Sequence, residues 1–183
     1  MAAVIGLDRE TLKDICLASR NCSIANFNSP VQLVISGEPE AVDRAKVKSQ
    51  EAGAKRIIDL EVSGAFHSKL MWEAAMEFKG FLEEAVEFNQ PQIPLVSNVD
   101  ARPASKITAI KENLVKQIYS PVMWEDSMVY ILSQGVDKFI EFGPGKVLAG
   151  LMRKIKPEAQ VLSIEKIGDL ESVLSRLKIP RSQ

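Results

Sequence analysis

The first 62 residues alternate short β-prone runs with amphipathic helical segments in one definite order. The predicted strands cover 2–7, 23–28, 32–36 and 56–62, and the predicted helices cover 8–18 and 39–52. Asp8 is a suitable N-cap for the first helix, and Gly53 is placed to end the second. The order βαββαβ is the split βαβ pattern of a ferredoxin-like domain. We therefore predict a ferredoxin-like small domain over residues 1–62.

Residues 63–183 alternate helices and strands in a different way, as in an α/β protein. The pattern predicts helices over 68–86, 106–117 and 125–134, a helix ending at 153 and a closing helix, with strands over 93–96, 138–142 and 160–164. A parallel sheet needs helices on both faces, and three strands are too few to form one that is well covered. Residues 63–183 are therefore expected to be part of a larger α/β domain.

Charge and composition exclude several classes of function. The formal net charge is -1 and the sequence pI is about 6.0, so no basic field for nucleic acid covers the protein. No apolar run is long enough to span a membrane, and residues 1–7 are too short for a signal peptide. With one histidine in the chain, Cys16 and Cys22 cannot complete a zinc site, so we expect reduced thiols and a cytoplasmic protein. A targeting segment upstream would place it in an organelle instead.

The single histidine, His67, lies between Phe66 and Ser68, where a glycine-containing strand end meets a helix start. Enzymes of the α/β class often place catalytic groups at such junctions. A lone histidine at a helix start is nevertheless more often an ordinary polar loop residue. Position alone therefore favours the ordinary role.

The turn Gly143-Pro144-Gly145-Lys146 has the glycines of a phosphate-binding loop but lacks its other residues. Ile140 stands at the first glycine position and Val147 at the Ser/Thr position. We therefore interpret this segment as a tight structural turn between a strand and a helix.

Five segments of the chain share their sequence and their order with one enzyme family. They are Gly64-Ala65-Phe66-His67-Ser68 and the segments 26–37, 97–100, 117–124 and 141–148. Together they extend over most of the chain, from about residue 2 to residue 164. The chain resembles the malonyl-CoA:acyl-carrier-protein transacylases of fatty-acid and polyketide synthesis. The resemblance implies that residues 63–183 are the C-terminal part of an α/β-hydrolase-like catalytic domain.

The same resemblance implies a ping-pong transfer of malonyl from CoA to the phosphopantetheine thiol of acyl carrier protein, with no further cofactor and no metal. In this family a serine carries the malonyl group as an ester, and a histidine, here His67, is its general base. The backbone carbonyl of Gln117 matches the group that orients the histidine. Asp100 is then not needed as a triad member, and we interpret it as a turn residue that bonds its own backbone.

The family also assigns substrate-binding roles to several positions. Phe66 stands beside the base, where methylmalonyl-selective relatives have serine, and so favours malonyl. Lys55-Arg56 matches a basic pair near the CoA phosphates, although such a pair at a strand edge commonly serves solubility. Val31 stands where the family often has glycine, which puts the turn before Gln32 in question. The other matching positions are Asn26, Asn28, Gln32 and Asn98.

Two groups that the family needs are not found in this sequence. No Gly-x-Ser-x-Gly nucleophile elbow occurs, and the arginine that binds the malonyl carboxylate is also missing; both belong upstream. Ser63 and Ser68 flank the histidine motif outside any strained elbow, so neither is expected to replace the nucleophile. We expect this chain alone to be inactive and to need the missing N-terminal segment. The alternative is a non-catalytic module that binds CoA or carrier protein.

Overall fold

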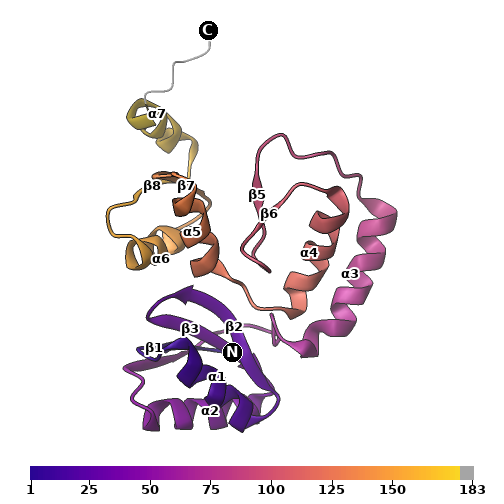
Figure 1. Ribbon diagram of the computed structural model, residues 1–183, viewed down its shortest axis with the longest axis vertical. Helices are drawn as coiled ribbons and strands as arrows, with labels where there is room; N and C mark the ends of the chain where they lie inside the picture. Colours follow the sequence, from indigo (N-terminus) through magenta and orange to yellow (C-terminus); the bar gives the residue numbers. More distant parts are fainter. Residues whose placement is uncertain (178–183) are drawn as a thin grey trace. The chain divides into compact units, whose positions relative to one another are not determined.

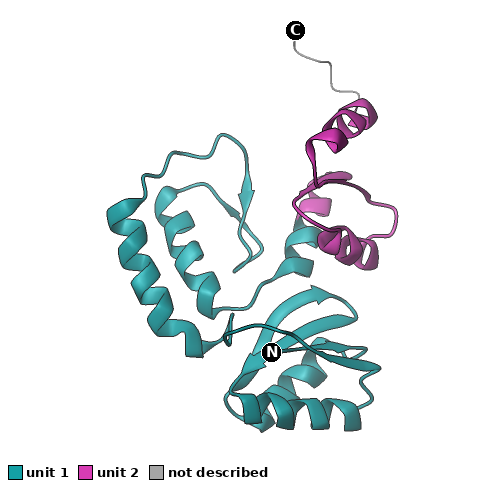
Figure 2. Cartoon of the chain, turned by 180° about the vertical axis from the view of Figure 1, so that it is seen from behind, with its two compact units in different colours: residues 1–130 teal, residues 131–183 magenta. Residues whose placement is uncertain are grey.

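The computed structural model describes residues 1–177, whose helices and strands are shown in Figure 1. The chain divides into two compact units, residues 1–130 and residues 131–183 (Figure 2). Both units combine helices with strands, which gives the chain a mixed α/β fold. No helix within residues 1–177 has both the length and the apolar character that crossing a membrane requires.

Unit 1 begins with a four-stranded antiparallel sheet in the order β2-β3-β1-β4. Its elements are β1 (Ala2–Ile5), α1 (Arg9–Ser19), β2 (Cys22–Ser29), β3 (Gln32–Gly37), α2 (Pro39–Glu51) and β4 (Arg56–Asp59). All six segments predicted for this region are confirmed. Two strands are shorter than predicted: the first ends at Ile5 instead of residue 7, and the last ends at Asp59 instead of residue 62.

The two helices α1 and α2 pack on one face of this sheet. Leu12 of α1 and Val42 of α2 are buried in one cluster with alternate strand residues, among them Val4 and Ile35. Successive side chains of a strand point to opposite faces. The intervening strand residues therefore form a second, smaller cluster around Val34 on the face that the helices leave uncovered.

Local chemistry fixes both ends of α1. The Asp8 carboxylate accepts the N–H of Thr11 at 2.9 Å, as predicted for an N-cap. After the helix, Arg20 and Asn21 both adopt left-handed backbone conformations, with φ of 50° and 49°. A Cβ atom on Gly37 would collide with the Asn21 carbonyl, so the close approach of this turn to β3 requires glycine.

The hairpin between β2 and β3 turns at Pro30-Val31. Val31 is not one of the described residues that have a positive φ, so this turn does not need glycine. Pro30 suits the first central position of such a turn, and the Val31 carbonyl accepts the N–H of Gly6 at 2.9 Å. A β-branched residue is therefore compatible with the turn, and Gln32 pairs with Ser29 directly after it.

The rest of unit 1 contains two packed helices and a small antiparallel sheet. Its elements are η1 (Lys69–Met71), α3 (Trp72–Ala85), β5 (Leu95–Val96), β6 (Pro103–Ala104), α4 (Ile107–Tyr119) and the first part of α5 (Trp124–Ser133). The helix predicted over 68–86 is confirmed, but its first turn is a 3-10 helix. The helices α3 and α4 share a core around Leu82 and Val115, and the rings of Trp72 and Tyr119 meet edge to face at 4.8 Å.

Unit 2 is built on a parallel pair of strands, β7 (Lys138–Phe142) and β8 (Gln160–Ile164), each followed by a helix. The helices are α6 (Val147–Ile155) and α7 (Ile167–Leu177). Both strands have the predicted bounds. The third strand predicted for residues 63–183 was 93–96; it is shorter in the structure, β5 over Leu95–Val96, and pairs with β6 in unit 1.

Glu141 of β7 fixes the turn that leads into α6. Its buried carboxylate accepts the N–H groups of Leu148 and Ala149 at 2.9 and 3.3 Å, and the Ser163 hydroxyl at 3.1 Å. The two N–H groups lie in the first turn of α6, where a helix has no partners for them. The protein's own carboxylate occupies the place that a phosphate would take, which agrees with a structural turn at 143–146.

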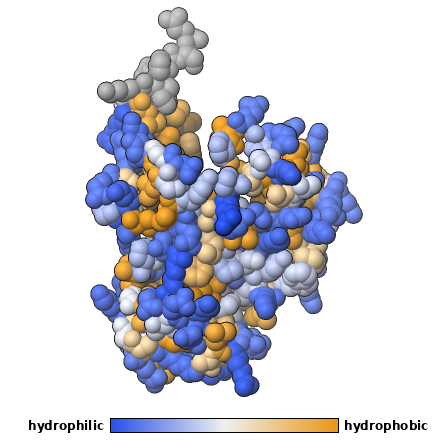
Figure 3. All heavy atoms as spheres, in the orientation of Figure 1, coloured by the Kyte–Doolittle hydropathy of each residue, from blue (hydrophilic) through white to orange (hydrophobic). Residues whose placement is uncertain are grey.

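Large apolar side chains remain exposed in both units. Figure 3 shows orange apolar residues at the surface among blue hydrophilic ones. In unit 2, Phe142 is 73% exposed although it belongs to β7, and Ile167 is 89% exposed. In unit 1, Phe81 of α3 and Ile93 are exposed as well. These side chains leave apolar area in contact with water, which is unfavourable.

Candidate active site

His67 is held at the C-terminal end of α4 by two hydrogen bonds. Its backbone N–H donates to the Ile118 carbonyl at 3.0 Å, and its Nδ1 atom lies 2.6 Å from the Gln117 carbonyl oxygen. Both carbonyls belong to the last turn of α4, where carbonyl groups have no partner within the helix. The end of α4 therefore fixes both the backbone and the ring of His67.

The partner of Nδ1 determines the tautomer of the His67 imidazole. A carbonyl oxygen can only accept a hydrogen bond, so Nδ1 carries the proton and Nε2 of the neutral ring keeps its lone pair. The residue is half-buried, which limits but does not prevent access to the ring. A neutral imidazole in this arrangement is suited to take a proton from a hydroxyl or a thiol.

The backbone of His67 is in the left-handed region, with φ of 59°. For a residue other than glycine this conformation costs about 1–2 kcal/mol. It persists where the surroundings determine it, as they do at many functional sites. The next residue, Ser68, is buried and its hydroxyl donates to the Ala65 carbonyl at 2.7 Å. The Ser68 hydroxyl therefore stabilises the turn around His67.

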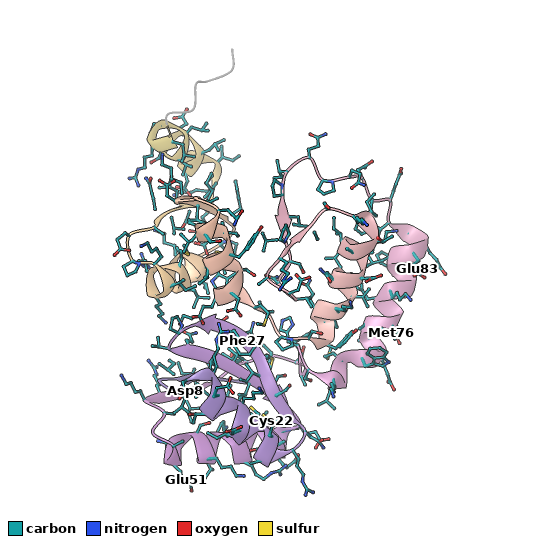
Figure 4. The ribbon with its side chains drawn as sticks, viewed as in Figure 1. Asp8, Cys22, Phe27, Glu51, Met76 and Glu83 are labelled. Atoms are coloured by element: carbon teal, nitrogen blue, oxygen red, sulfur yellow. The ribbon has the colours of Figure 1, made fainter. Side chains whose placement is uncertain are left out.

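A short extended segment connects this site to the four-stranded sheet. The N–H of Val122 donates to the Ala25 carbonyl at 2.8 Å, and the N–H of Phe27 donates to the Val122 carbonyl at 2.9 Å. Val122 thereby forms a parallel bridge with Asn26 at the free edge of β2. Figure 4 labels Phe27 on this strand. The site is thus joined to the sheet by main-chain hydrogen bonds.

Asn98 is attached to the same segment from the other side. Its carbonyl accepts the N–H of Met123 at 2.7 Å, and its Nδ2 lies 3.5 Å from Oε1 of Gln117. Hydrogen bonds therefore connect His67, Gln117 and Asn98, and the segment at Val122 and Met123 joins Asn98 to the strand that carries Asn26. Phe66 is 39% exposed beside His67, and its ring lies over Gly64.

The predicted polar residues of the small sheet lie on the face without helices. Residues paired across neighbouring strands point to the same face, and Asn26 is paired with Val34 of the cluster on that face. Gln32 and Arg56 are both opposite Ile5, so they lie in one row across three strands, roughly 10 Å apart at the usual strand spacing.

Asn28 and Lys55 have no paired residue that would place them in the row of Gln32 and Arg56. Asn28 falls in the register shift between Phe27 and Ser29 and has no paired residue. Lys55 is exposed, and its aliphatic stem approaches Gly6 so closely that a Cβ there would collide with it. Lys55 and Arg56 form no ion pair among the residues that the structure describes.

A cluster of charged residues around Arg9 was not predicted from the sequence. The guanidinium of Arg9 binds the carboxylates of Glu125 and Asp126 at 2.7 and 2.9 Å and lies 4.8 Å from the centre of the Phe27 ring. These contacts join the start of α1 to the start of α5, directly after the bridging residue Val122. No local pattern predicts the ion pairs, because Glu125 and Asp126 lie more than one hundred residues from Arg9 in the chain.

The described residues contain no group of three side chains that could hold a metal ion. Cys16 and Cys22 are free thiols, as expected.

Comparison with known proteins gives a consistent assignment, although no family model matches the chain. The chain is 42% identical over 175 residues to the malonyl CoA-acyl carrier protein transacylase of Staphylococcus aureus (strain COL), which covers 93% of this chain and 56% of that protein. The crystal structure of an acyl carrier protein S-malonyltransferase from Vibrio cholerae matches with a TM-score of 0.90 and 42% identity, over 94% of this chain and 57% of that one.

A third match is a malonyl-transacylase solved in complex with a type II polyketide acyl-carrier protein. Its TM-score is 0.91 at 39% identity, and the match covers 96% of this chain and 57% of that chain. The chain thus spans little more than half the length of the relatives it matches. At this identity, over nearly all of its own length, the chain belongs to the malonyl CoA-acyl carrier protein transacylase family.

Proposed function

We propose that this chain provides the histidine base and the small domain for malonyl transfer from CoA to the phosphopantetheine thiol of acyl carrier protein. The observation that carries the proposal is the 2.6 Å contact between Nδ1 of His67 and the Gln117 carbonyl oxygen. It presents Nε2 as a proton acceptor without any carboxylate in a third position.

In the proposed reaction, Nε2 of His67 takes the proton of a serine hydroxyl while the serine oxygen attacks the malonyl thioester. The imidazolium then returns this proton to the sulfur of CoA as the thiol leaves. In the second half the base takes the proton of the phosphopantetheine thiol, whose sulfur attacks the malonyl ester. The imidazolium returns this proton to the serine oxygen as it leaves, which restores the hydroxyl and the neutral base. The serine would come from a Gly-x-Ser-x-Gly segment that this sequence does not contain.

The polar residues of the sheet would hold the thioester substrate. Asn26, Gln32 and Arg56 lie on the face that α1 and α2 leave uncovered, and Asn98 is joined to the base through Gln117. We assign Asn26, Asn28, Gln32 and Asn98 to the pantetheine and acyl portion of the substrate. Lys55 and Arg56, which are exposed and form no ion pair among the described residues, are assigned to the CoA phosphates. Phe66 would border the acyl group beside the base.

The proposed domains follow from the strand order. The βαββαβ sequence and the sheet order β2-β3-β1-β4 support a ferredoxin-like small domain over residues 1–62. We assign residues 63–183 to the C-terminal part of an α/β-hydrolase-like catalytic domain. The complex of a related malonyl-transacylase with an acyl-carrier protein supports the same class of partner for this chain.

A chimera tests the proposal. We would join this chain to the part of the Staphylococcus aureus relative that it does not cover and measure malonyl transfer to acyl carrier protein. His67→Ala should lower transfer by about two to four orders of magnitude, the usual effect of losing a positioned base. Ser63→Ala is the matched control and should keep the activity, because Ser63 flanks the motif without a catalytic role.

The results separate three possibilities. Near-normal transfer by the His67→Ala chimera would contradict the assignment of the base. A malonyl ester formed by the 183-residue chain alone would contradict the need for an external serine. A folded chimera that binds malonyl-CoA but transfers nothing would favour the non-catalytic binding module.

A further inference from the structure

The two cysteines of the chain lie in contact although neither takes part in the proposed reaction. Cys16 is buried in α1, and Cys22 is the half-buried first residue of β2. Their Sγ atoms are 3.9 Å apart. The structure therefore places two thiols side by side at the start of the strand on which Cys22 is labelled in Figure 4.

The turn between the two cysteines restricts their relative movement. Arg20 and Asn21 hold left-handed backbone conformations, and the Asn21 carbonyl is packed against Gly37. A disulfide bond is about 2.05 Å long, so the sulfur atoms must approach each other by almost 2 Å. We expect the two side chains to rotate and the end of α1 to shift slightly when the sulfur atoms approach each other.

The two thiols differ in their electrostatic surroundings. The pKa of Cys22 is lowered by the hydrogen bond with Cys16 and, further away, by the Arg44 guanidinium, although burial opposes this change. The pKa of Cys16 is raised by its hydrogen bond with Cys22 and by burial. The pair therefore consists of one thiol suited to be a nucleophile and one that stays protonated.

A pocket in unit 1 borders the cysteine pair. Cys16 and Cys22 line a pocket of about 400 Å³, whose wall also contains Leu17, Phe27 and Pro121. A water molecule occupies about 30 Å³ in the liquid. A peroxide of similar size has ample room to reach Cys22 through this pocket.

We propose that Cys16 and Cys22 are a modification site at which a peroxide produces an intramolecular disulfide. The Cys22 thiolate attacks one oxygen of hydrogen peroxide, the O–O bond breaks, and the released hydroxide takes up a proton to give water and a Cys22 sulfenic acid. The Cys16 sulfur then attacks the Cys22 sulfur; hydroxide leaves and combines with the Cys16 proton as a second water. Two thiols are oxidised to one disulfide, and one peroxide is reduced to two waters.

The 183-residue chain itself is the material for the test, and the test is independent of the transfer activity. After treatment with a small excess of hydrogen peroxide, both free thiols should be lost and the intact mass should fall by two hydrogens. Dithiothreitol should reverse the change, and the chain should stay monomeric on a non-reducing gel. Mass gain by separate oxidation of both thiols, or disulfide-linked dimers as the main product, would overturn the proposal.

Two matched variants test the order of events. Cys16→Ser should stop at a sulfenic acid on Cys22, which dimedone traps. Cys22→Ser should react with peroxide on the order of tenfold more slowly, because Cys16 is buried in α1, where burial disfavours the thiolate and limits access to it. In urea the two variants should react at similar rates, since the difference depends on the folded surroundings. Equal rates in the folded variants, or a rate difference that persists in urea, would contradict the proposed roles.

Discussion

The left-handed backbone of His67 leads to an unusual prediction about stability. We compare His67→Gly with His67→Ala in the 183-residue chain. Both variants lose the hydrogen bond from Nδ1 to the Gln117 carbonyl, which is worth about 1 kcal/mol. Both keep the backbone N–H that donates to Ile118. The two variants therefore differ only in how well residue 67 accepts a φ of 59°.

The expected difference can be worked out from that angle. Alanine keeps the cost of about 1–2 kcal/mol for a left-handed L-residue, and glycine does not. Glycine loses about 0.5–1 kcal/mol more conformational freedom on folding. His67→Gly should therefore be more stable than His67→Ala by about 0.5–1 kcal/mol. With a urea slope near 2 kcal/mol per molar, the unfolding midpoint should be about 0.2–0.5 M higher.

The assay is urea unfolding followed by circular dichroism, with a control pair at an exposed helical position. Glu77 lies inside α3, where alanine should be more stable than glycine by about 1 kcal/mol. The order of the two variants should thus reverse between positions 67 and 77. If alanine is at least as stable as glycine at position 67, the histidine is not held in a left-handed conformation and our account of its orientation fails.

Three further predictions follow from side chains elsewhere in the chain. In the chimera described above, Phe66→Ser should raise methylmalonyl transfer relative to malonyl transfer by about 10- to 200-fold; an unchanged ratio in a competition assay would mean that Phe66 does not border the acyl group. Glu141→Ala should destabilise unit 2 by about 2–4 kcal/mol because it leaves helix N–H groups unpaired, and Glu141→Gln by less; hydrogen exchange at the Leu148 amide should be faster, and unchanged exchange would contradict the cap. The Thr11 N–H lowers the pKa of Asp8 below its ordinary 3.8. The stabilisation by this cap is therefore present above pH 3.8 and is lost as the pH falls through the lowered pKa. The temperature of thermal unfolding between about pH 5 and pH 2 should depend less on pH in Asp8→Asn than in the unchanged chain, and equal dependence would exclude this role.

Local sequence signals were sufficient for most of the fold. The apolar runs at 138–142 and 160–164 predict β7 and β8 with their observed bounds, because turn residues enclose both of them. Asp8 predicts the start of α1, because its carboxylate can accept a backbone N–H of the first helical turn. The pairing of β5 with Pro103–Ala104 was not predicted, since a two-residue strand with proline has no periodicity to detect.

The site was accessible from the sequence only through resemblance. Position favoured an ordinary loop role for His67, and nothing local indicates that Gln117, fifty residues away, lies at its ring. Its left-handed φ was not predicted either, because the backbone N–H of His67 is bound by the Ile118 carbonyl, which is also distant in the sequence. The Arg9 cluster arises from contacts over more than one hundred residues, which only the folded chain brings together.

Because His67 is the only histidine among the 183 residues, the chain contains its own spectroscopic label. Labelling histidine with nitrogen-15 gives a single imidazole spectrum that needs no assignment. The two ring nitrogens resonate far apart when one is protonated and the other is not, so the spectrum reads the tautomer directly. The same two signals would report, without any enzymatic assay, whether a joined segment or a substrate reaches the base.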